Sequence, residues 1–140
     1  MRVVHGTSEA HAATIQRWGF RTGTYFADDP DARYCLSSIY AAKRAIEMGG
    51  RPVLLIAEIP ADKLHQSHES RDWVEQKWRR DHGIDPLVEL VIYEPMPPSV
   101  IVEVRDDSAR MREMVLCGDK DGDLRRFGRT RREVLAALAA

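Results

Sequence analysis

Cysteine is scarce in this chain, since Cys35 and Cys117 are the only two among 140 residues. Two cysteines so far apart do not form a disulfide framework or a paired metal knuckle, and no basic-apolar signal segment follows Met1. Long hydrophobic runs are missing too, because no apolar stretch approaches the roughly 20 residues of a membrane-spanning helix. We therefore expect a protein of the reducing cytoplasm, with no metal and no membrane contact.

Net charge is also nearly absent, at -1 with both signs interspersed, so charge neither indicates nor excludes a nucleic-acid partner. The chain is instead rich in hydrophobic residues, at 44%, beside 31% charged residues. This balance is typical of one compact soluble domain with a core of ordinary size. We expect residues 1–140 to form that single domain.

Two tyrosines lie nine residues apart across an acidic turn. Tyr25 and Phe26 follow the flexible Gly23 and are typical of the end of a short strand, with side chains on opposite faces. The periodicity of residues 31–46 predicts a helix, so Tyr34 would lie in its first turn and lean back over the strand end. The two rings indicate a slot for a planar heteroaromatic ligand, and the alternative is that both are ordinary packing residues.

A polar corner is predicted near the N-terminus. Residues 2–5 predict a short strand ended by Gly6, and Thr7 or Ser8 would cap a helix that runs to about Trp18 and stops at Gly19. A histidine at such a corner can donate a hydrogen bond to a sugar hydroxyl, and glycine lets a planar amide approach the main chain. His5, Gly6 and Thr7 therefore indicate a binding corner, unless His5 merely caps the strand.

Two further apolar segments predict buried strands. Residues 52–60 are almost continuously apolar and fit a central strand, whereas residues 87–93 contain one carboxylate, Glu89. A glutamate among apolar neighbours must point to solvent or enter a cleft where it has a partner. Residues 100–104 predict a strand that returns beside 87–93 in a hairpin-like pair.

In this order, the motifs resemble the catalytic domain of poly(ADP-ribose) polymerase-like ADP-ribosyltransferases, the diphtheria-toxin-like branch with a His-Tyr-Glu triad. The motifs cover about residues 2–104. The resemblance implies an α+β, ADP-ribosyltransferase-like fold, in which two packed, mostly antiparallel β-sheets with flanking helices form an NAD+ cleft. The catalytic residues that it implies are Glu89, His5 and Tyr25. The NAD+-binding residues that it implies are His5, Gly6, Thr7, Tyr25, Phe26, Ala27 and Tyr34.

The activity implied by the resemblance is mono-ADP-ribosylation, with NAD+ as the substrate and a protein or nucleic acid as the acceptor. His5 and Thr7 would bind the adenosine-side ribose, Gly6 would hold the nicotinamide carboxamide, and Tyr34 would stack on the nicotinamide ring. Glu89 would bind the nicotinamide ribose and stabilise the oxocarbenium-like sugar left by departing nicotinamide. Because the chain is short, we expect transfer of a single ADP-ribose, by a toxin, an effector-like enzyme or a regulatory enzyme.

Two positions depart from the pattern of the family. Asp31 replaces a serine that usually helps to bind the carboxamide, and Leu87 replaces the acid or amide of arginine-modifying relatives. An NAD+-using RNA 2'-phosphotransferase on the same fold stays open as an alternative, although its arginine-rich signature is not found beside His5. A catalytically inactive module that binds ADP-ribose or nucleic acid is the other alternative.

The last part of the chain, residues 105–140, predicts a charged C-terminal extension that ends in a helix over 133–140. Five arginines surround Phe127 there, and arginine recognises phosphate with a fixed fork. They indicate a contact with a polyanion, with a solvated lead-in to the helix as the alternative. The five are Arg125, Arg126, Arg129, Arg131 and Arg132.

Overall fold

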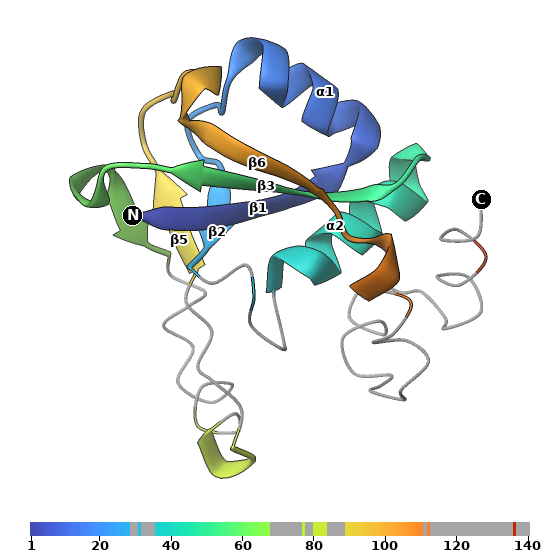
Figure 1. The fold of residues 1–140 in the computed structure, drawn as a ribbon. Coiled ribbons are helices and arrows are strands. Elements are labelled where there is room, and N and C mark those ends of the chain that lie inside the picture. The colour runs from blue at the N-terminus through green and yellow to red at the C-terminus, as the bar shows by residue number, and fades with distance from the viewer. Residues whose placement is uncertain are drawn as a thin grey trace.

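The computed structural model of the protein describes residues 1–28, 31, 36–67, 77, 80–83, 89–110, 112 and 136. Within this part, six strands form one open antiparallel sheet in the order β4-β5-β2-β1-β3-β6 (Figure 1). The strands are β1 (Arg2–Ser8), β2 (Tyr25–Ala27), β3 (Pro52–Glu58), β4 (Leu64–Gln66), β5 (Glu89–Ile92) and β6 (Ile101–Asp106). The helices are α1 (Glu9–Trp18), α2 (Leu36–Met48) and the short 3-10 turns η1 (Ala61–Lys63) and η3 (Pro98–Val100).

The two long helices cover opposite faces of the sheet, with α1 above it and α2 below it in Figure 1. Because side chains alternate along a strand, each buried strand supplies both faces. Val3 and Leu55 belong to the core on the α1 side, whereas Val4 and Leu54 belong to the smaller core on the α2 side, around Ala41. The nearly continuous apolar run of β3 therefore follows from burial on both of its faces, as predicted.

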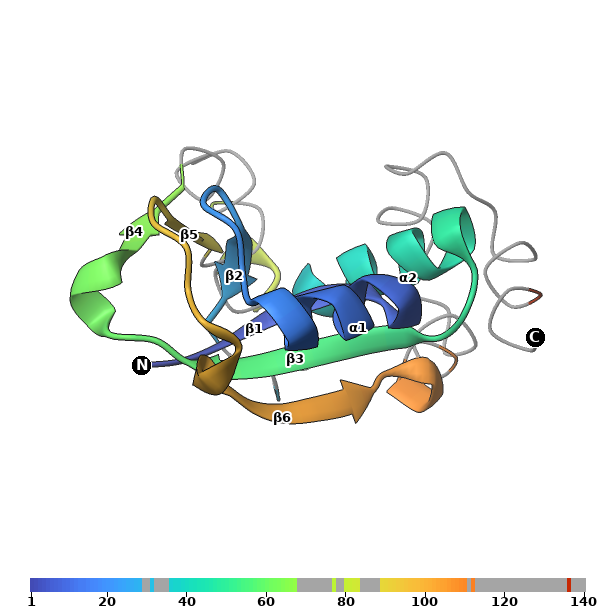
Figure 2. The ribbon, with the colours of Figure 1, turned by 90° about the horizontal axis from the view of Figure 1, so that it is seen from above.

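The sheet opens between its two central strands. β1 pairs with β3 along its whole length, but it pairs with β2 only where Val4 lies opposite Ala27. Beyond that position β2 and β5 run at a steep angle to β1 and β3, as Figures 1 and 2 show. Side chains then satisfy backbone carbonyls near the opening: Ser37 Oγ donates to Val4 O at 3.0 Å, and His5 Nδ1 bonds Tyr25 O at 2.7 Å.

The α+β class and the antiparallel pairing are confirmed, but the described residues form one open sheet rather than two packed sheets. The strands belong to one sheet because β1 is hydrogen-bonded to β2 on one edge and to β3 on the other. The strand that was expected to stop at Gly6 also continues to Ser8, because Thr7 and Ser8 still pair with the start of β3.

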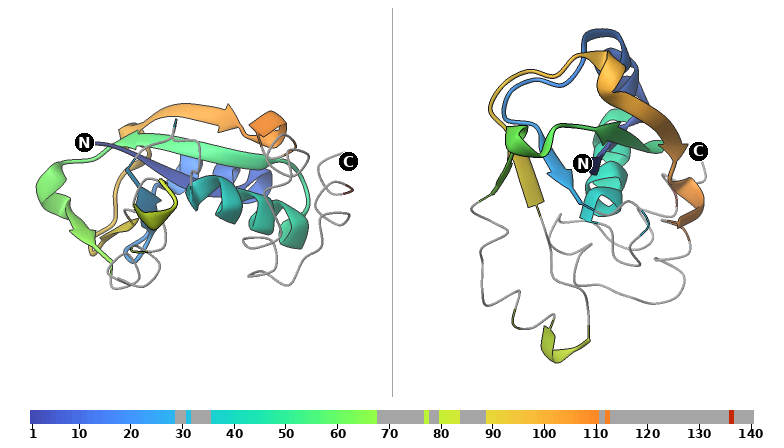
Figure 3. Two further views of the ribbon diagram at one scale, coloured as in Figure 1. Left: turned by 90° about the horizontal axis from the view of Figure 1, so that it is seen from below. Right: turned by 60° about the vertical axis from the view of Figure 1, so that its left-hand side comes forward.

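The predicted hairpin of β5 and β6 is wrong. β6 pairs with β3 at one edge of the sheet, while β5 lies between β2 and β4 (Figure 3). The segment that connects β5 to β6 forms an isolated antiparallel bridge with the residue after α1. In this bridge Phe20 N donates to Met96 O at 2.8 Å and Met96 N donates to Phe20 O at 2.9 Å. This bridge directs the chain away from β5 and across to β3.

The helix ends agree with the sequence. Ser8 is the N-cap of α1, since its hydroxyl accepts a hydrogen bond from His11 N at 3.2 Å. Gly19 ends this helix with φ of 84°, and its N–H donates to Ile15 O at 2.7 Å. Gly49, with φ of 79°, follows α2 in the same way.

Several predictions fall outside the described residues. They include Tyr34 and the five arginines of the C-terminal extension. Arg105 and Asp106, which were assigned to that extension, belong to β6. No helix in the described part of the chain is long and apolar enough to cross a membrane.

Close packing of α2 on β1 requires glycine at position 6. A Cβ atom on Gly6 would collide with the Ser37 carbonyl oxygen, which is helix backbone and cannot move aside cheaply. We expect Gly6→Ala to lower the free energy of unfolding by about 1–3 kcal/mol, as overpacked cores do. Urea denaturation measures the change.

Gly49→Ala is the control, because its Cβ meets nothing within 4 Å and it introduces only left-handed backbone strain, about 1 kcal/mol. Wild-type stability of Gly6→Ala would contradict the close approach of α2 to β1.

Candidate functional site

Two cavities lie at the opening of the sheet, and both are lined by His5, Thr24 and Arg44. We call the first the carboxylate cavity; its volume is about 460 Å³. It is lined by His5, Gly6, Gly23, Thr24, Tyr25, Phe26, Ala27, Ser37, Tyr40, Arg44 and Glu89. The second, the basic cavity, has a volume of about 560 Å³. It is lined by His5, Thr7, His11, Thr14, Ile15, Trp18, Gly19, Phe20, Arg21, Thr24, Arg44 and Pro95.

The carboxylate cavity brings together most of the residues that the sequence singled out. Six of them line it: His5, Gly6, Tyr25, Phe26, Ala27 and Glu89. They come from three strands, and the residues from β2 are at least 62 positions away from Glu89 in the sequence. Thr7 lines the basic cavity instead, and Tyr34 lies outside the described residues. The residues singled out from the sequence therefore form one wall of this cavity, drawn from β1, β2 and β5.

Glu89 enters the cavity because of strand alternation. Leu90 and Ile92 point into the core beneath α1, so Glu89 faces the α2 side, where it lies opposite the small Ala27. Its side chain is only 4% exposed, and Ser67 Oγ donates a hydrogen bond to Glu89 Oε1 at 2.8 Å. Of the two fates predicted for this carboxylate, the structure shows a cleft with a partner.

The imidazole of His5 stands between the two cavities. A carbonyl oxygen has no proton to donate, so in the 2.7 Å contact Nδ1 carries the proton and Tyr25 O accepts it. The opposite ring nitrogen of the neutral imidazole is then an acceptor. Phe20 and Phe26 pack against the ring with centroids 5.8 Å away, which keeps the imidazole in place.

Burial lowers the pKa of His5 below its ordinary value of 6.5, and the positive charge of Arg44 acts in the same direction. The hydrogen bond to the Tyr25 carbonyl opposes this shift without reversing it. His5 is therefore neutral at physiological pH and presents an acceptor rather than a charge.

Tyr25 lies at the mouth of the carboxylate cavity. Its side chain is 50% exposed, whereas that of Phe26 is 2% exposed and belongs to the core, so the predicted split between the faces of β2 is confirmed. Tyr40 on α2 also lines this cavity. The cavity thus has aromatic rings from a strand and from a helix, which are surfaces on which a planar ring can stack.

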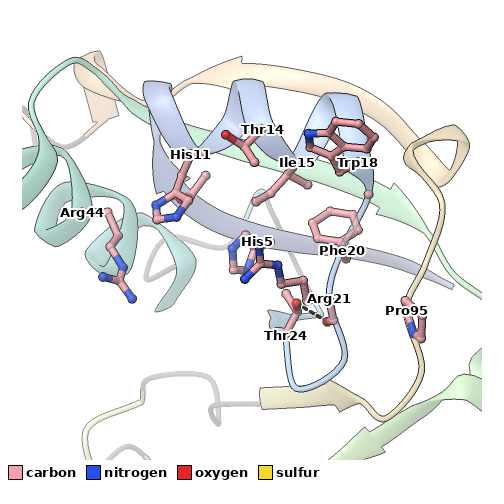
Figure 4. A pocket seen from close by; sticks show the side chains of 12 residues that line it. His5, His11, Thr14, Ile15, Trp18, Phe20, Arg21, Thr24, Arg44 and Pro95 are labelled. Carbon is pink, nitrogen blue, oxygen red and sulfur yellow. Dashed lines mark hydrogen bonds between the residues drawn. The ribbon is translucent and has the colours of Figure 1, made fainter.

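The basic cavity contains nitrogen-rich side chains from three places in the chain. His11 comes from the first turn of α1, Arg21 from the loop before β2 and Arg44 from α2 (Figure 4). Thr24 fixes the loop, since its hydroxyl donates to the Arg21 carbonyl. None of the described residues that line this cavity carries a carboxylate. Its chemistry suits an anion such as a phosphate group.

Sequence reasoning missed Tyr40, Arg44, His11 and Arg21, and some of them could have been found. Tyr40 and Arg44 are four residues apart, so they share a face of α2. Ser67 carried no pattern of its own, since only the pairing of β4 with β5 brings it to Glu89. In the described residues no group of three or more histidine, cysteine, aspartate and glutamate side chains is arranged to hold a metal ion.

Comparison with known proteins assigns no family to this site. No protein-family model matches the chain, and no curated protein matches it. The geometry alone therefore defines the class: an antiparallel α+β domain in which a carboxylate cavity and a basic cavity meet at a neutral histidine.

The lowered pKa of His5 predicts how stability depends on pH. The unfolded chain binds a proton near pH 6.5 and the folded chain binds it only at lower pH, so protons favour unfolding in this window. We expect the free energy of unfolding to fall below pH 6.5 by at most about 1.4 kcal/mol per pH unit. His5→Asn retains an N–H donor for Tyr25 O but does not titrate, and it should lack this component.

Urea denaturation between pH 5 and pH 8 measures the slope. His65→Asn is the control for the loss of a histidine side chain, because His65 is exposed on β4 and lines neither cavity. Parallel curves for wild type and His5→Asn would show that the histidine is not held neutral by the fold.

Proposed function

We propose that the protein is an NAD+-dependent mono-ADP-ribosyltransferase with an ADP-ribosyltransferase-like fold. The observation that carries the proposal is that one cavity contains a buried carboxylate, Glu89, together with His5, Gly6 and Tyr25. These are the residues whose order along the chain resembles the His-Tyr-Glu branch. The proposal requires these residues to lie in one cavity. An unrelated sequence would have no reason to bring them together.

The carboxylate cavity suits the nicotinamide half of NAD+. The ring of Tyr25 offers a stacking surface at the mouth, and Gly6 lines the same cavity, where its main chain would hold the carboxamide. Glu89 would accept a hydrogen bond from the nicotinamide ribose.

The basic cavity suits the ADP half. NAD+ is too long for either cavity alone, and because His5 lines both, a dinucleotide would pass this imidazole. Arg21 and Arg44 would hold the negatively charged pyrophosphate, and Thr7 and His5 would bond the adenosine ribose. Arg21 lines the basic cavity alone, whereas Arg44 lines both cavities, so the proposed pyrophosphate site has two guanidinium groups and no lining carboxylate.

The reaction follows from these placements. The bond between the ribose C1' and the nicotinamide nitrogen breaks, and its electron pair leaves with nicotinamide, which becomes neutral. The ribose carbon gains oxocarbenium character, which the Glu89 carboxylate stabilises in a site with little water. A nucleophile on a protein or nucleic-acid acceptor then bonds to C1' and releases its proton, so a single ADP-ribose is transferred.

The role of the carboxylate is tested by Glu89→Gln, which keeps size and hydrogen bonding but removes the charge. We expect nicotinamide release from NAD+ to fall at least about 100-fold, the scale on which loss of transition-state charge stabilisation acts. The dissociation constant for NAD+ should change less than about threefold. Glu58→Gln, at the exposed end of β3, is the matched control and should keep wild-type turnover. Equal turnover in Glu89→Gln and wild type would refute the role.

The division of NAD+ between the cavities is tested with fragments. Arg21→Ala should weaken binding of ADP-ribose about tenfold or more, because a hydrogen bond to a charged group is lost, and should leave binding of nicotinamide unchanged. Isothermal titration calorimetry measures both affinities. Arg51→Ala removes the same charge from an exposed site outside both cavities and controls for net charge. Equal weakening of both fragments would contradict the assignment.

An RNA 2'-phosphotransferase that uses NAD+ is the second candidate, and the composition of the basic cavity favours it. Such enzymes depend on several arginines and a second histidine, and Arg21, Arg44 and His11 line one cavity with His5. Incubation with NAD+ and a 2'-phosphorylated RNA distinguishes the two candidates. Loss of the 2'-phosphate supports the phosphotransferase, a stable ADP-ribose adduct supports the transferase, and binding without nicotinamide release indicates an inactive module.

A further inference from the structure

Ser67 makes two hydrogen bonds to the same residue, Glu89. Its backbone N–H donates to Glu89 O at 2.9 Å, and its hydroxyl donates to Glu89 Oε1 at 2.8 Å. Both side chains are 4% exposed. The pair is therefore shielded from water, and a hydrogen bond from a hydroxyl to a buried carboxylate is among the stronger kinds in proteins.

The backbone bond determines where the hydroxyl points. β4 pairs with β5 so that Gln66 lies opposite Leu90, and the Ser67 bond extends this ladder by one residue beyond the end of β4. The position of Ser67 relative to Glu89 is thus set by main-chain pairing, before any ligand binds. A serine has a short side chain with one torsion, so its hydroxyl varies little once the backbone is placed.

The hydrogen bond from Ser67 limits the orientations of the Glu89 carboxylate. A glutamate side chain has three rotatable bonds, and in an open cavity it would sample several orientations. A carboxylate offers about four lone-pair sites, and the bond from Ser67 uses one of them and restricts rotation of the group. A positioned carboxylate needs less reorganisation when positive charge develops on the sugar.

We propose that Ser67 is a positioning residue, which orients the Glu89 carboxylate toward the ribose of NAD+ in the carboxylate cavity; the proposal rests on the proposed function. Other buried serines do a different task. Ser8 caps α1, and Ser37 bonds the backbone carbonyl of Val4, so both stabilise main chain. Ser67 instead bonds the side chain that lines the cavity.

The test compares three replacements of Ser67 by kcat and KM for nicotinamide release. Ser67→Ala should lower kcat about 10- to 100-fold, the range expected for a lost bond to a charged group, and should change KM for NAD+ less than about threefold. Ser67→Cys has nearly the size of serine but is a weak donor, and it should lose activity similarly while keeping the melting temperature. Ser67→Thr keeps the hydroxyl and should recover kcat to within about threefold of wild type.

Ser38→Ala is the matched control, because Ser38 is fully buried and lines neither cavity. It should lower the melting temperature without lowering kcat per folded molecule. If Ser67→Cys retains wild-type kcat, or if Ser67→Ala loses only thermal stability, Ser67 is structural and the proposal is overturned.

Glu89→Gln and the double variant Ser67→Ala/Glu89→Gln complete the experiment. A positioning residue acts through its carboxylate, so the double variant should be no slower than Glu89→Gln alone. Additive losses would overturn the proposal. If Glu89→Gln is inactive and Ser67→Ala is fully active, only the role of Ser67 fails. If the wild-type protein releases no nicotinamide, the proposed function fails, and the role of Ser67 fails with it.

Discussion

The site depends on one break in backbone pairing, where β1 and β2 separate after Val4 and Ala27. Backbone carbonyl groups that lose a strand partner bond to side chains or to water instead. At this opening the His5 side chain bonds the Tyr25 carbonyl, and the Ser37 side chain bonds the Val4 carbonyl. The His5 imidazole that bonds the Tyr25 carbonyl also lines both cavities. The separation of β1 from β2 therefore produces the site.

Electrostatics divides the opening into two environments. On the α2 side, burial and the bond from Ser67 hold a carboxylate, while on the α1 side Arg21 lines a cavity with no acidic side chain among its described residues. Arg44 lines both cavities. A neutral His5 lies between them. The proposed ligand, NAD+, carries positive charge at one end and negative charge in its middle.

Local patterns in the sequence predicted much of this arrangement. The cap at Ser8, the stop at Gly19 and the two faces of β2 depend on neighbouring residues alone, and all three agree with the structure. Long-range pairing was less predictable. The hairpin expected for β5 and β6 was wrong because the bridge between Phe20 and Met96 redirects the chain. Such a bridge joins residues far apart in the sequence, so no local pattern predicts it.

The sequence by itself determined which chemical groups are present and how the strands alternate, since propensity and periodicity act within a few residues. It thus indicated that Glu89 would be either solvated or partnered in a cleft. Only the tertiary structure decided which, because the partner, Ser67, is 22 residues away and arrives through the pairing of β4 with β5. Arg21 and Arg44 likewise share a cavity only because a loop and a helix converge on the opening of the sheet, a contact set by packing rather than by spacing along the chain.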